Sequence, residues 1–281
     1  MTSIADLGLA CVATALYVHP VKACAPVPVD ELVLDARGAA TGDRGWAIVN
    51  GRGEVTWQGE FPRLALVRPR VAGAGLLLAA TGLPDVATPA ELAACQVKIW
   101  SDLKAAHEVF DAADAGDAVA GWLAQVTGAP ARLVRLSDAA VAREGNNALH
   151  LVFAPSVAQV DAQRAAEGRP AADLRRYRPN IVLSGPAGED GIEFIEESLA
   201  ALEWPQASGP VRLDITAPCV RCPVPNVDPE SGVVDETVGD TLGRMSRQRR
   251  GEGGTVFGVY ARGPAGARLR VGDGARMVID F

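Results

Sequence analysis

Aromatic residues and histidines are scarce in this sequence of 281 residues, and basic residues are fewer than acidic ones. Lysine and arginine number 27 against 34 aspartates and glutamates, which gives a formal net charge of −7. Nucleic acids are bound mainly through basic surfaces, so we expect no nucleic-acid partner for a chain this acidic. Aromatic residues make up only 5% of the chain, so alanine, valine and leucine must supply most of the core.

Long hydrophobic runs and a regular set of cysteines are also missing. The apolar run Leu7–Val18 is too short to span a bilayer, and no basic region of the kind that begins a signal peptide precedes it. The five cysteines are odd in number and irregularly spaced, which disfavours a disulfide framework and favours a reducing compartment. We therefore expect a cytoplasmic protein with no membrane partner.

The glycine-rich signatures of nucleotide-binding proteins are absent as well. No Gly-x-Gly-x-x-Gly follows a predicted strand, and no Gly-x-x-x-x-Gly-Lys occurs. These loops matter because their backbone amides approach and cradle phosphates. The sequence gives no support for a dinucleotide-binding fold or a P-loop.

Short apolar runs separated by the 30 glycines and 19 prolines indicate many short strands. Asn50-Gly51 is the strongest hairpin signal, because Asn-Gly takes the positive φ angles of a type I′ turn. We predict a mainly β protein with some helices (α+β). The predicted strands are Leu16–Val21, Val27–Leu34, Trp46–Val49, Val55–Trp57, Leu64–Val71, Leu76–Ala80, Val97–Trp100, Leu133–Leu136, His150–Phe153, Arg178–Leu183, Val211–Thr216, Thr255–Ala261 and Ala275–Ile279.

Helical spacing of apolar residues occurs in fewer places. It predicts one helix within Asp114–Val126, ended by Gly128, and a second from about Ser156 to Ala166. Glu193–Leu202 is predicted as a third, short helix. The polar stretch Ser137–Asn147 is the expected join between two domains, which is the number that the chain length favours.

The motif Cys219-Val-Arg-Cys222 is the first candidate for chemistry, and its spacing alone leaves four interpretations open. Half of a zinc site would need a second pair, but the other cysteines are single and only three histidines exist. A redox pair should open a helix, which the flanking prolines oppose. A thiolate beside Arg221 would suit a soft metal or a metal cofactor. The fourth interpretation is two inert cysteines in a loop.

Two basic clusters are candidates for anion binding. One combines Lys22 with Arg44, and the other is the run Arg175–Asn180 before an apolar strand. The arginine fork binds phosphate through two hydrogen bonds, and asparagine offers a donor and an acceptor to the edge of a heterocycle. The alternative is that such arginines simply form a solvated face.

These segments, taken in order, resemble a known family. The first half resembles the N-terminal β-barrel domain that precedes MOSC domains, and the second half resembles the MOSC domain itself. The segments of the first half are Tyr17-Val-His-Pro-Val-Lys-Ala-Cys24, Gly42-Asp-Arg-Gly-Trp46 and Phe61-Pro-Arg-Leu-Ala65. Those of the second half are Arg175-Arg-Tyr-Arg-Pro-Asn180, Cys219-Val-Arg-Cys222, Val227-Asp-Pro-Glu-Ser-Gly232, Thr241-Leu242 and Phe257-Gly258.

The chain is similar to the amidoxime-reducing MOSC proteins. This resemblance implies an N-terminal β-barrel-like domain at 14–136, a MOSC β-barrel domain at 146–281, and a cleft between them that binds a molybdenum cofactor of the molybdopterin type. It implies that Cys222 is the protein ligand of molybdenum. The further cofactor-contacting residues that it implies are Lys22, Arg44, Ser156, Arg178, Asn180, Val220 and Arg221.

Two positions depart from the family pattern. Ala23 stands where the family usually has serine, which removes a hydrogen-bond donor, and Pro223-Val-Pro225 stiffens the segment after Cys222. We expect Cys219 to be structural. Neither departure removes the metal ligand, but both imply a substrate pocket of this chain's own.

The resemblance implies a molybdenum-dependent oxidoreductase that reduces amidoximes, hydroxamic acids, N-hydroxyguanidines and N-hydroxylated bases by taking the oxygen of the N–OH group. Because no iron–sulfur domain is recognisable after the last predicted strand, we expect a separate electron donor, a flavoprotein or a ferredoxin-like protein. Two alternatives remain: a carrier of the cofactor or of sulfur without reductase turnover, and a binding protein without the cofactor.

Overall fold

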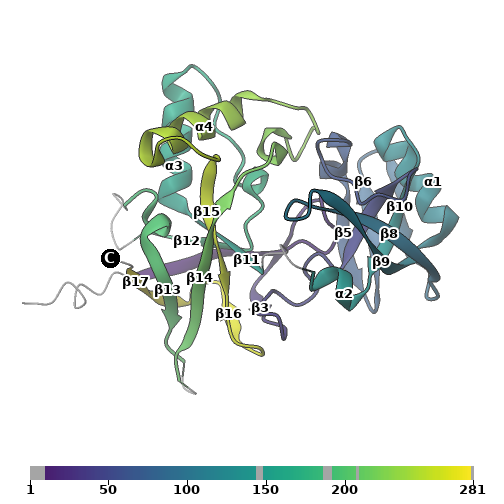
Figure 1. The fold of residues 1–281 in the computed structure, drawn as a ribbon, viewed down its shortest axis with the longest axis horizontal. Coiled ribbons are helices and arrows are strands. Elements are labelled where there is room, and N and C mark those ends of the chain that lie inside the picture. The colour runs from purple at the N-terminus through teal and green to yellow at the C-terminus, as the bar shows by residue number, and fades with distance from the viewer. Residues whose placement is uncertain (1–9, 144–147, 186–191, 207–208, 280–281) are drawn as a thin grey trace, which may run out of the picture.

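The computed structural model describes residues 10–143, 148–185, 192–206 and 209–279 (Figure 1). The beginning of the chain and residues 144–147 of the predicted join lie outside these described residues. Strands hold 41% of the chain and helices 23%, so the prediction of a mainly β fold with some helices is confirmed. Within the described ranges, no helix combines the length and the apolar character needed to cross a bilayer.

A closed barrel of seven strands forms one half of the molecule (Figure 1). The strand order is β12-β11-β15-β14-β13-β17-β1, and pairing of β1 with β12 closes the ring. Only β11 and β12 pair in parallel; the other neighbours are antiparallel. The strands are β1 (Ala10–Val18), β11 (Leu149–Phe153), β12 (Ile181–Leu183), β13 (Leu199–Trp204), β14 (Val211–Val220), β15 (Val256–Arg262) and β17 (Gly274–Ile279).

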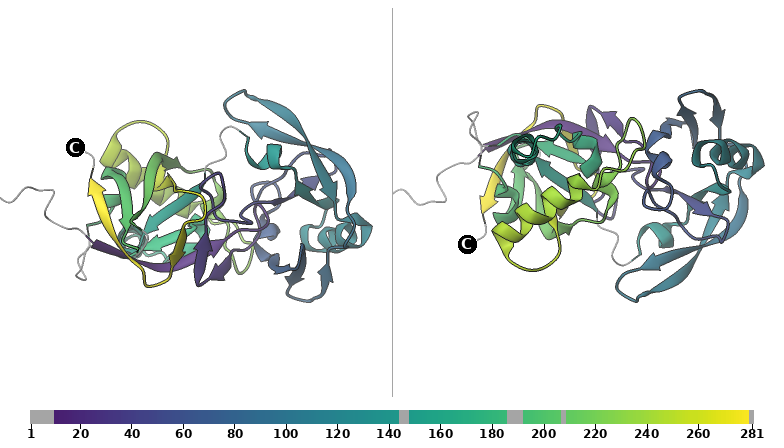
Figure 2. Two further views of the ribbon diagram at one scale, coloured as in Figure 1. Left: turned by 90° about the horizontal axis from the view of Figure 1, so that it is seen from below. Right: turned by 90° about the horizontal axis from the view of Figure 1, so that it is seen from above.

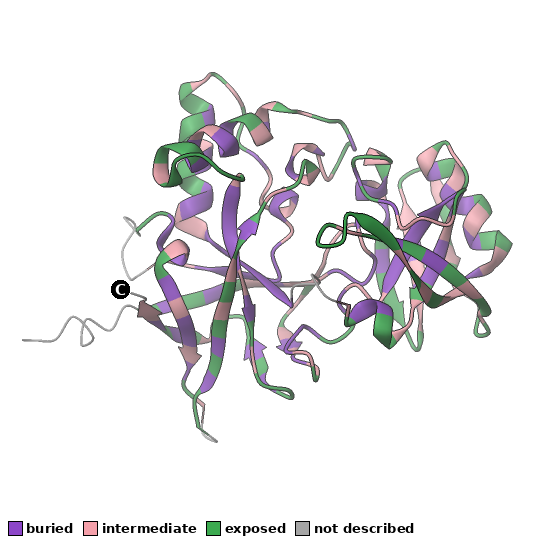
Figure 3. Ribbon diagram, in the orientation of Figure 1, coloured by how far each residue is buried: buried purple, intermediate pink, exposed green. Residues whose placement is uncertain are grey.

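Alternation along the strands explains why the barrel forms. In β14, Val211 and Leu213 are buried whereas Arg212 and Asp214 are exposed. Figure 3 shows buried and exposed residues alternating along the barrel strands. Side chains of successive strand residues point to opposite faces, so one face of each strand fills the barrel and the other meets water. Fully buried leucines from five of the barrel strands and Trp204 belong to this core.

Strand β1 comes from the beginning of the chain, yet it is hydrogen-bonded within this barrel. Cys11 pairs with Ala275 and Leu16 pairs with Ile181. The first domain was predicted to begin at residue 14, which lies in the middle of β1. This strand pairs with strands of the second half. The chain therefore enters the barrel, leaves it to build the other half, and returns.

The other half packs two sheets and a helix around its own core (Figure 2). Helix α1 buries Val119, Trp122, Leu123 and Val126, and it ends at Gly128, whose φ of 76° is left-handed, as the sequence predicts. One sheet has the order β4-β10-β9-β8 and the other β5-β6-β7. The elements are β4 (Trp46–Asn50), η2 (Pro62–Leu66), β5 (Arg68–Ala72), β6 (Gly75–Ala80), β7 (Leu83–Ala87), β8 (Ala93–Ser101), β9 (Ala106–Asp114), α1 (Gly116–Thr127), β10 (Ala131–Leu136) and α2 (Asp138–Val141).

Two helices cover one side of the barrel (Figure 1). Helix α3 (Ala154–Ala166) lies where the sequence predicts it, whereas α4 (Thr237–Arg250) was not predicted, because its apolar residues are few among arginines. Both pack on Phe257 and its neighbours. The remaining elements are β2 (Val27–Val29), β3 (Glu31–Val33), η3 (Leu174–Tyr177), η4 (Ile195–Ser198), η5 (Val224–Asn226) and β16 (Arg268–Arg270).

Some predictions of local structure are wrong. The strand predicted at Leu64–Val71 begins within η2, and only its second part is a strand, β5. The strand predicted at Val27–Leu34 is divided into β2 and β3, which pair with β1 and β16. The helix predicted at Glu193–Leu202 is the short turn η4 followed by β13, because pairing with β14 and β17 outweighs the local preference. The return strand predicted at Val55–Trp57 is reduced to one bridge between Val49 and Val55, on the edge of β4 opposite to β10.

Candidate functional site

A cavity of about 260 Å³ lies between the two halves of the chain. Both halves contribute to its wall, so the predicted cleft between the domains is present. The residues from the first half are Lys22, Ala23, Arg44 and Trp57. Those from the second half are His150, Tyr177, Arg178, Cys219, Val220, Arg221, Cys222, Val224 and Tyr260.

The Cys219–Cys222 segment forms the end of β14 and the loop after it. Cys219 is buried, whereas Val220 and Cys222 are exposed. The backbone N–H of Arg221 donates to the carbonyl of Thr255 at 2.7 Å, which fixes the loop to the start of β15. Only the three-residue turn η5 follows, so the helix that a redox pair needs is not there. Among the described residues, no group of three or more His, Cys, Asp or Glu side chains could hold a metal, which excludes a zinc site built from them.

The guanidinium of Arg221 connects this loop to its surroundings. Nη1 donates to Sγ of Cys219 at 3.0 Å, and Nη2 donates to the carbonyl of Tyr177 at 2.9 Å. Burial raises the pKa of the Cys219 thiol, but the charges of His150 and Arg221 outweigh it and lower the pKa to about 5. The loop therefore holds one buried cysteine that favours the thiolate and one exposed cysteine.

Positive charge dominates the polar wall of the cavity. Lys22, Arg44, Arg178 and Arg221 line it, and no carboxylate does. Burial, followed by the charge of Arg143, lowers the pKa of Lys22 to about 8. Burial, followed by the charge of Arg44, lowers the pKa of Arg178 to about 10. Buried cations that repel one another are costly, so this cavity is built for an anion.

Two buried donors of these arginines have no partner among the described residues. They are Nη2 of Arg178 and Nε of Arg221. Nη1 of Arg178, by contrast, donates to the carbonyl of Cys24 at 2.7 Å. A buried donor left without an acceptor destabilises a fold by about 1–3 kcal/mol, so these atoms point to a ligand with acceptor oxygens.

The backbone around the cavity is strained in a consistent way. Ala23, Arg44 and Arg178 have φ angles of 70°, 52° and 57°. The described residues contain five non-glycine residues with positive φ, and these three all line the cavity. Such conformations cost about 1–3 kcal/mol each and gather at ligand sites. The strain turns Arg44 and Arg178 toward the cavity from opposite halves.

Ser156 and Asn180 do not line the cavity, although the resemblance gave both a contact with the cofactor. Ser156 is fully buried; its hydroxyl donates to Glu196 at 2.8 Å and accepts from the backbone N–H of Phe194 at 2.8 Å. It serves a buried carboxyl group whose pKa burial raises to about 7. Ser156 thus lies in the core and not in the wall of the cavity.

Asn180 is also fully buried, but it supports the site from behind. Its Nδ2 donates to Asp43 at 3.1 Å, and its Oδ1 accepts from the backbone N–H of His150 at 3.1 Å. Asp43 in turn pairs with Arg44. Asn180 thus positions residues of both halves without reaching the cavity itself.

Five residues of the cavity wall were not predicted as site residues from the sequence: Trp57, His150, Tyr177, Val224 and Tyr260. Tyr177 lies within the basic run Arg175–Asn180, and His150 and Trp57 lie within segments that were predicted as strands. Each is a single residue with no partner at a characteristic spacing. Local sequence therefore held no signal for them.

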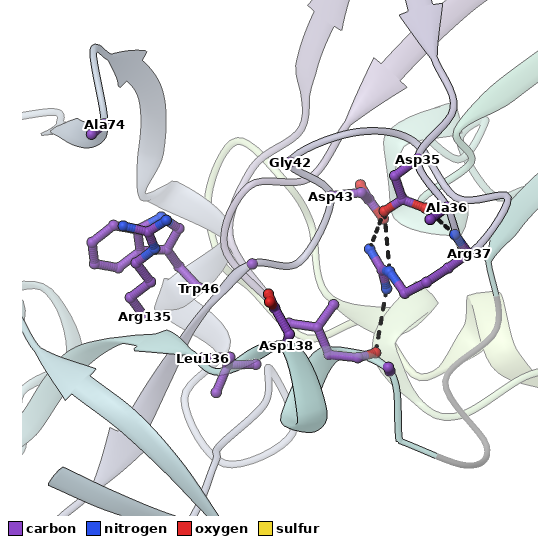
Figure 4. A pocket seen from close by; sticks show the side chains of 13 residues that line it. Asp35, Ala36, Arg37, Gly42, Asp43, Trp46, Ala74, Arg135, Leu136 and Asp138 are labelled. Atoms are coloured by element: carbon purple, nitrogen blue, oxygen red, sulfur yellow. Dashed lines mark hydrogen bonds and ion pairs between the residues drawn. The ribbon is translucent and has the colours of Figure 1, made fainter. Parts of the chain in front are cut away.

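The turn that carries Arg44 also borders a second cavity, of about 530 Å³ (Figure 4). Gly42, Asp43 and Trp46 belong to its wall, together with Arg37, which is paired with Asp35. This wall contains no cysteine or histidine. The Cys219–Cys222 motif therefore belongs to the cavity described first and not to this one.

Comparison with known proteins supports the division into two halves. Residues 10–130 match the family model of the MOSC N-terminal beta barrel domain, and residues 118–276 match that of the MOSC domain. Molybdenum cofactor sulfurase from Bos taurus is 26% identical over 279 residues, a match that covers 89% of this chain and 30% of the sulfurase. The chain thus spans less than a third of the length of that relative.

Two shorter relatives are covered more fully. Mitochondrial amidoxime reducing component 2 from Rattus norvegicus is 26% identical over 295 residues, which covers 94% of this chain and 82% of the relative. Mitochondrial amidoxime-reducing component 1 from Homo sapiens is 28% identical over 243 residues, which covers 78% of this chain and 67% of the relative.

Proposed function

Because the chain belongs to the MOSC family, we propose that its cavity holds a molybdenum cofactor of the molybdopterin type and that the protein reduces N-hydroxylated compounds. The substrates would be amidoximes, hydroxamic acids and N-hydroxylated bases. Such an activity accords with the names of the two amidoxime-reducing relatives. Because these relatives are only 26% and 28% identical to this chain, its substrate would depend on its own cavity residues.

One observation carries the proposal: an exposed cysteine and four cations line one cavity between the halves. The thiolate of Cys222 is the ligand that the protein would give to molybdenum, since soft sulfur suits this metal. The cations at residues 22, 44, 178 and 221 would hold the phosphate of the cofactor. The unpartnered donors of Arg178 and Arg221 fit such a group, because phosphate offers several acceptor oxygens.

The reaction needs two electrons and two protons for each N–OH group that becomes N–H with release of water. The bound cofactor would supply the two-electron chemistry. Tyr260 and His150 line the cavity and carry exchangeable protons, so they are the residues placed to donate them. Electrons would come from a separate flavoprotein or ferredoxin-like protein. All five cysteines are free, in keeping with work in the cytoplasm.

The test compares Cys222→Ser with Cys95→Ser, a control whose cysteine lies on β8 outside this cavity. We expect the wild-type chain and the control to contain one molybdenum per chain and to reduce benzamidoxime with an artificial donor. Cys222→Ser should lose the turnover, because a hydroxyl is a poor ligand for a soft metal. Full metal content and full rate in Cys222→Ser would refute the proposed ligand.

A second candidate function is transfer of the cofactor or of its sulfur without turnover. The buried Cys219 favours it, because its lowered pKa makes it a nucleophile next to the same cavity. The sulfurase relative is named for such chemistry. A carrier would show exchange of molybdopterin and a persulfide on cysteine in mass spectra, and no reduction of benzamidoxime.

A further inference from the structure

The cavity has an apolar side as well as a cationic one. Trp57 and Val220 line it from opposite halves of the chain, and they are 37% and 60% exposed. Large apolar side chains left open to solvent at a cavity usually contact a ligand. In the function proposed above, the cations would hold the cofactor. Trp57 would then face the substrate, and so would the exposed side of Val220, beside the cofactor contact that the resemblance implies for this residue.

The indole of Trp57 is held in place by Gly59, two residues further along the chain. A Cβ added at Gly59 would lie 2.3 Å from the indole atom Cη2, so the ring rests directly on the backbone of Gly59. The next side chain, Gln58, is buried and donates from Nε2 to the carbonyl of Ala23 at 2.6 Å. Since Ala23 belongs to the cavity wall, these contacts fix the indole relative to the cavity.

Val220 is held in the same manner from the other half. A Cβ added at Gly254 would lie 2.9 Å from Cγ1 of Val220, so this side chain rests on the backbone of Gly254. The N–H of Arg221 bonds to the carbonyl of Thr255 and ties the two segments together. Each half of the chain therefore presents one apolar side chain, seated on a glycine, to the same cavity.

From this geometry we propose that Trp57 and Val220 determine specificity by binding a flat apolar group, an aromatic ring, of the N-hydroxylated substrate. This proposal rests on the proposed function and refines its substrate class. An indole face suits a ring better than a short alkyl chain, because aromatic pairs gain energy beyond the area they bury.

Binding of two hydroxamic acids tests the proposal without turnover. Benzhydroxamic and acetohydroxamic acid share the N–OH group and differ in phenyl against methyl. In calorimetric titrations of the molybdenum-loaded protein, with no reductant, we expect benzhydroxamic acid to bind about tenfold more tightly. Trp57→Ala should abolish this preference, and Gly59→Ala should weaken it by displacing the indole. Trp57→Phe, which keeps a ring, should retain most of it.

Trp100→Ala is the matched control, because it removes a half-exposed indole on β8 that does not line the cavity. It should keep the full preference. An unchanged preference in folded, metal-loaded Trp57→Ala would overturn the proposal, as would equal binding of the two acids by the wild-type chain. A protein that lacks molybdenum and turnover yet keeps a phenyl preference that depends on Trp57 would refute the proposed function alone.

Discussion

The guanidinium of Arg221 bonds to the sulfur of Cys219 at 3.0 Å, although it lies directly beside Cys222 in the chain. The motif thereby separates two cysteines that look equivalent in sequence. Cys219 is buried and its sulfur accepts a hydrogen bond from Arg221, whereas Cys222 is exposed in the cavity. In the proposed function, this difference favours Cys222 as the ligand of the metal.

Cys219→Ser should therefore retain molybdenum, whereas Cys222→Ser should lose most of it. The serine at residue 219 keeps a hydrogen-bond acceptor for Arg221 and leaves the exposed thiol untouched. Metal analysis of the two freshly purified variants makes the comparison. Loss of the metal from Cys219→Ser together with full retention in Cys222→Ser would reverse our assignment of the ligand.

Lys22→Met and Arg178→Met should each lower retention of the cofactor about tenfold or more, because a charge-assisted hydrogen bond contributes about 1.5–3 kcal/mol. Methionine keeps most of the side-chain length and removes the charge. Pterin and metal content after gel filtration measure the loss. Lys98→Met, which removes an exposed cation outside the cavity, is the control and should keep both. Unchanged content in both cavity variants contradicts the anion-binding role.

Gly258→Ala should destabilise the fold by more than 2 kcal/mol, a size typical of backbone strain combined with a steric clash. Gly258 has a φ of +74°, and a Cβ there would lie 2.5 Å from Nε2 of His150 and 2.6 Å from the carbonyl oxygen of Leu151. Gly82→Ala isolates the strain, because Gly82 has a φ of +83° with open space around it. Its thermal midpoint should fall less; equal losses would show that the clash with His150 is relieved.

Glu196→Gln should remove a pH dependence of stability that arises far from the cavity. Burial raises the pKa of Glu196 from 4.5 to about 7, so the folded chain binds its proton more tightly than the unfolded chain does. Its contribution to stability is complete below pH 4.5 and is lost as the pH rises through about 7, a change of up to about 3 kcal/mol. Thermal melts of the variant should lack this decline. A parallel decline in both proteins assigns it to other groups.

The residues of the site that could be predicted from the sequence are those that occur in short motifs. Lys22, Arg44, Arg178 and the Cys219–Cys222 segment occur in short basic or thiol motifs, and the structure brings them to one cavity. Helix α1 was predictable for the same reason, since apolar spacing and a terminal glycine lie within one short stretch.

What could not be predicted depends on contacts between distant segments. The pairing of Leu16 with Ile181 has no local signature, nor has the meeting of Trp57 with Val220 at one cavity. The hydroxyl of Ser156 was assigned to the cofactor because its sequence context matched. In the structure this hydroxyl donates to Glu196, which lies in η4, within the segment that was predicted as one helix.

Strand β1 makes the two halves inseparable at the level of the chain. A fragment that begins at residue 146 would keep six of the seven barrel strands and leave β12 and β17 with open edges where β1 should lie. Open edges invite pairing with other molecules and hence aggregation. During synthesis on the ribosome, β1 emerges before the other strands of the barrel and must wait for β17 before the ring can close.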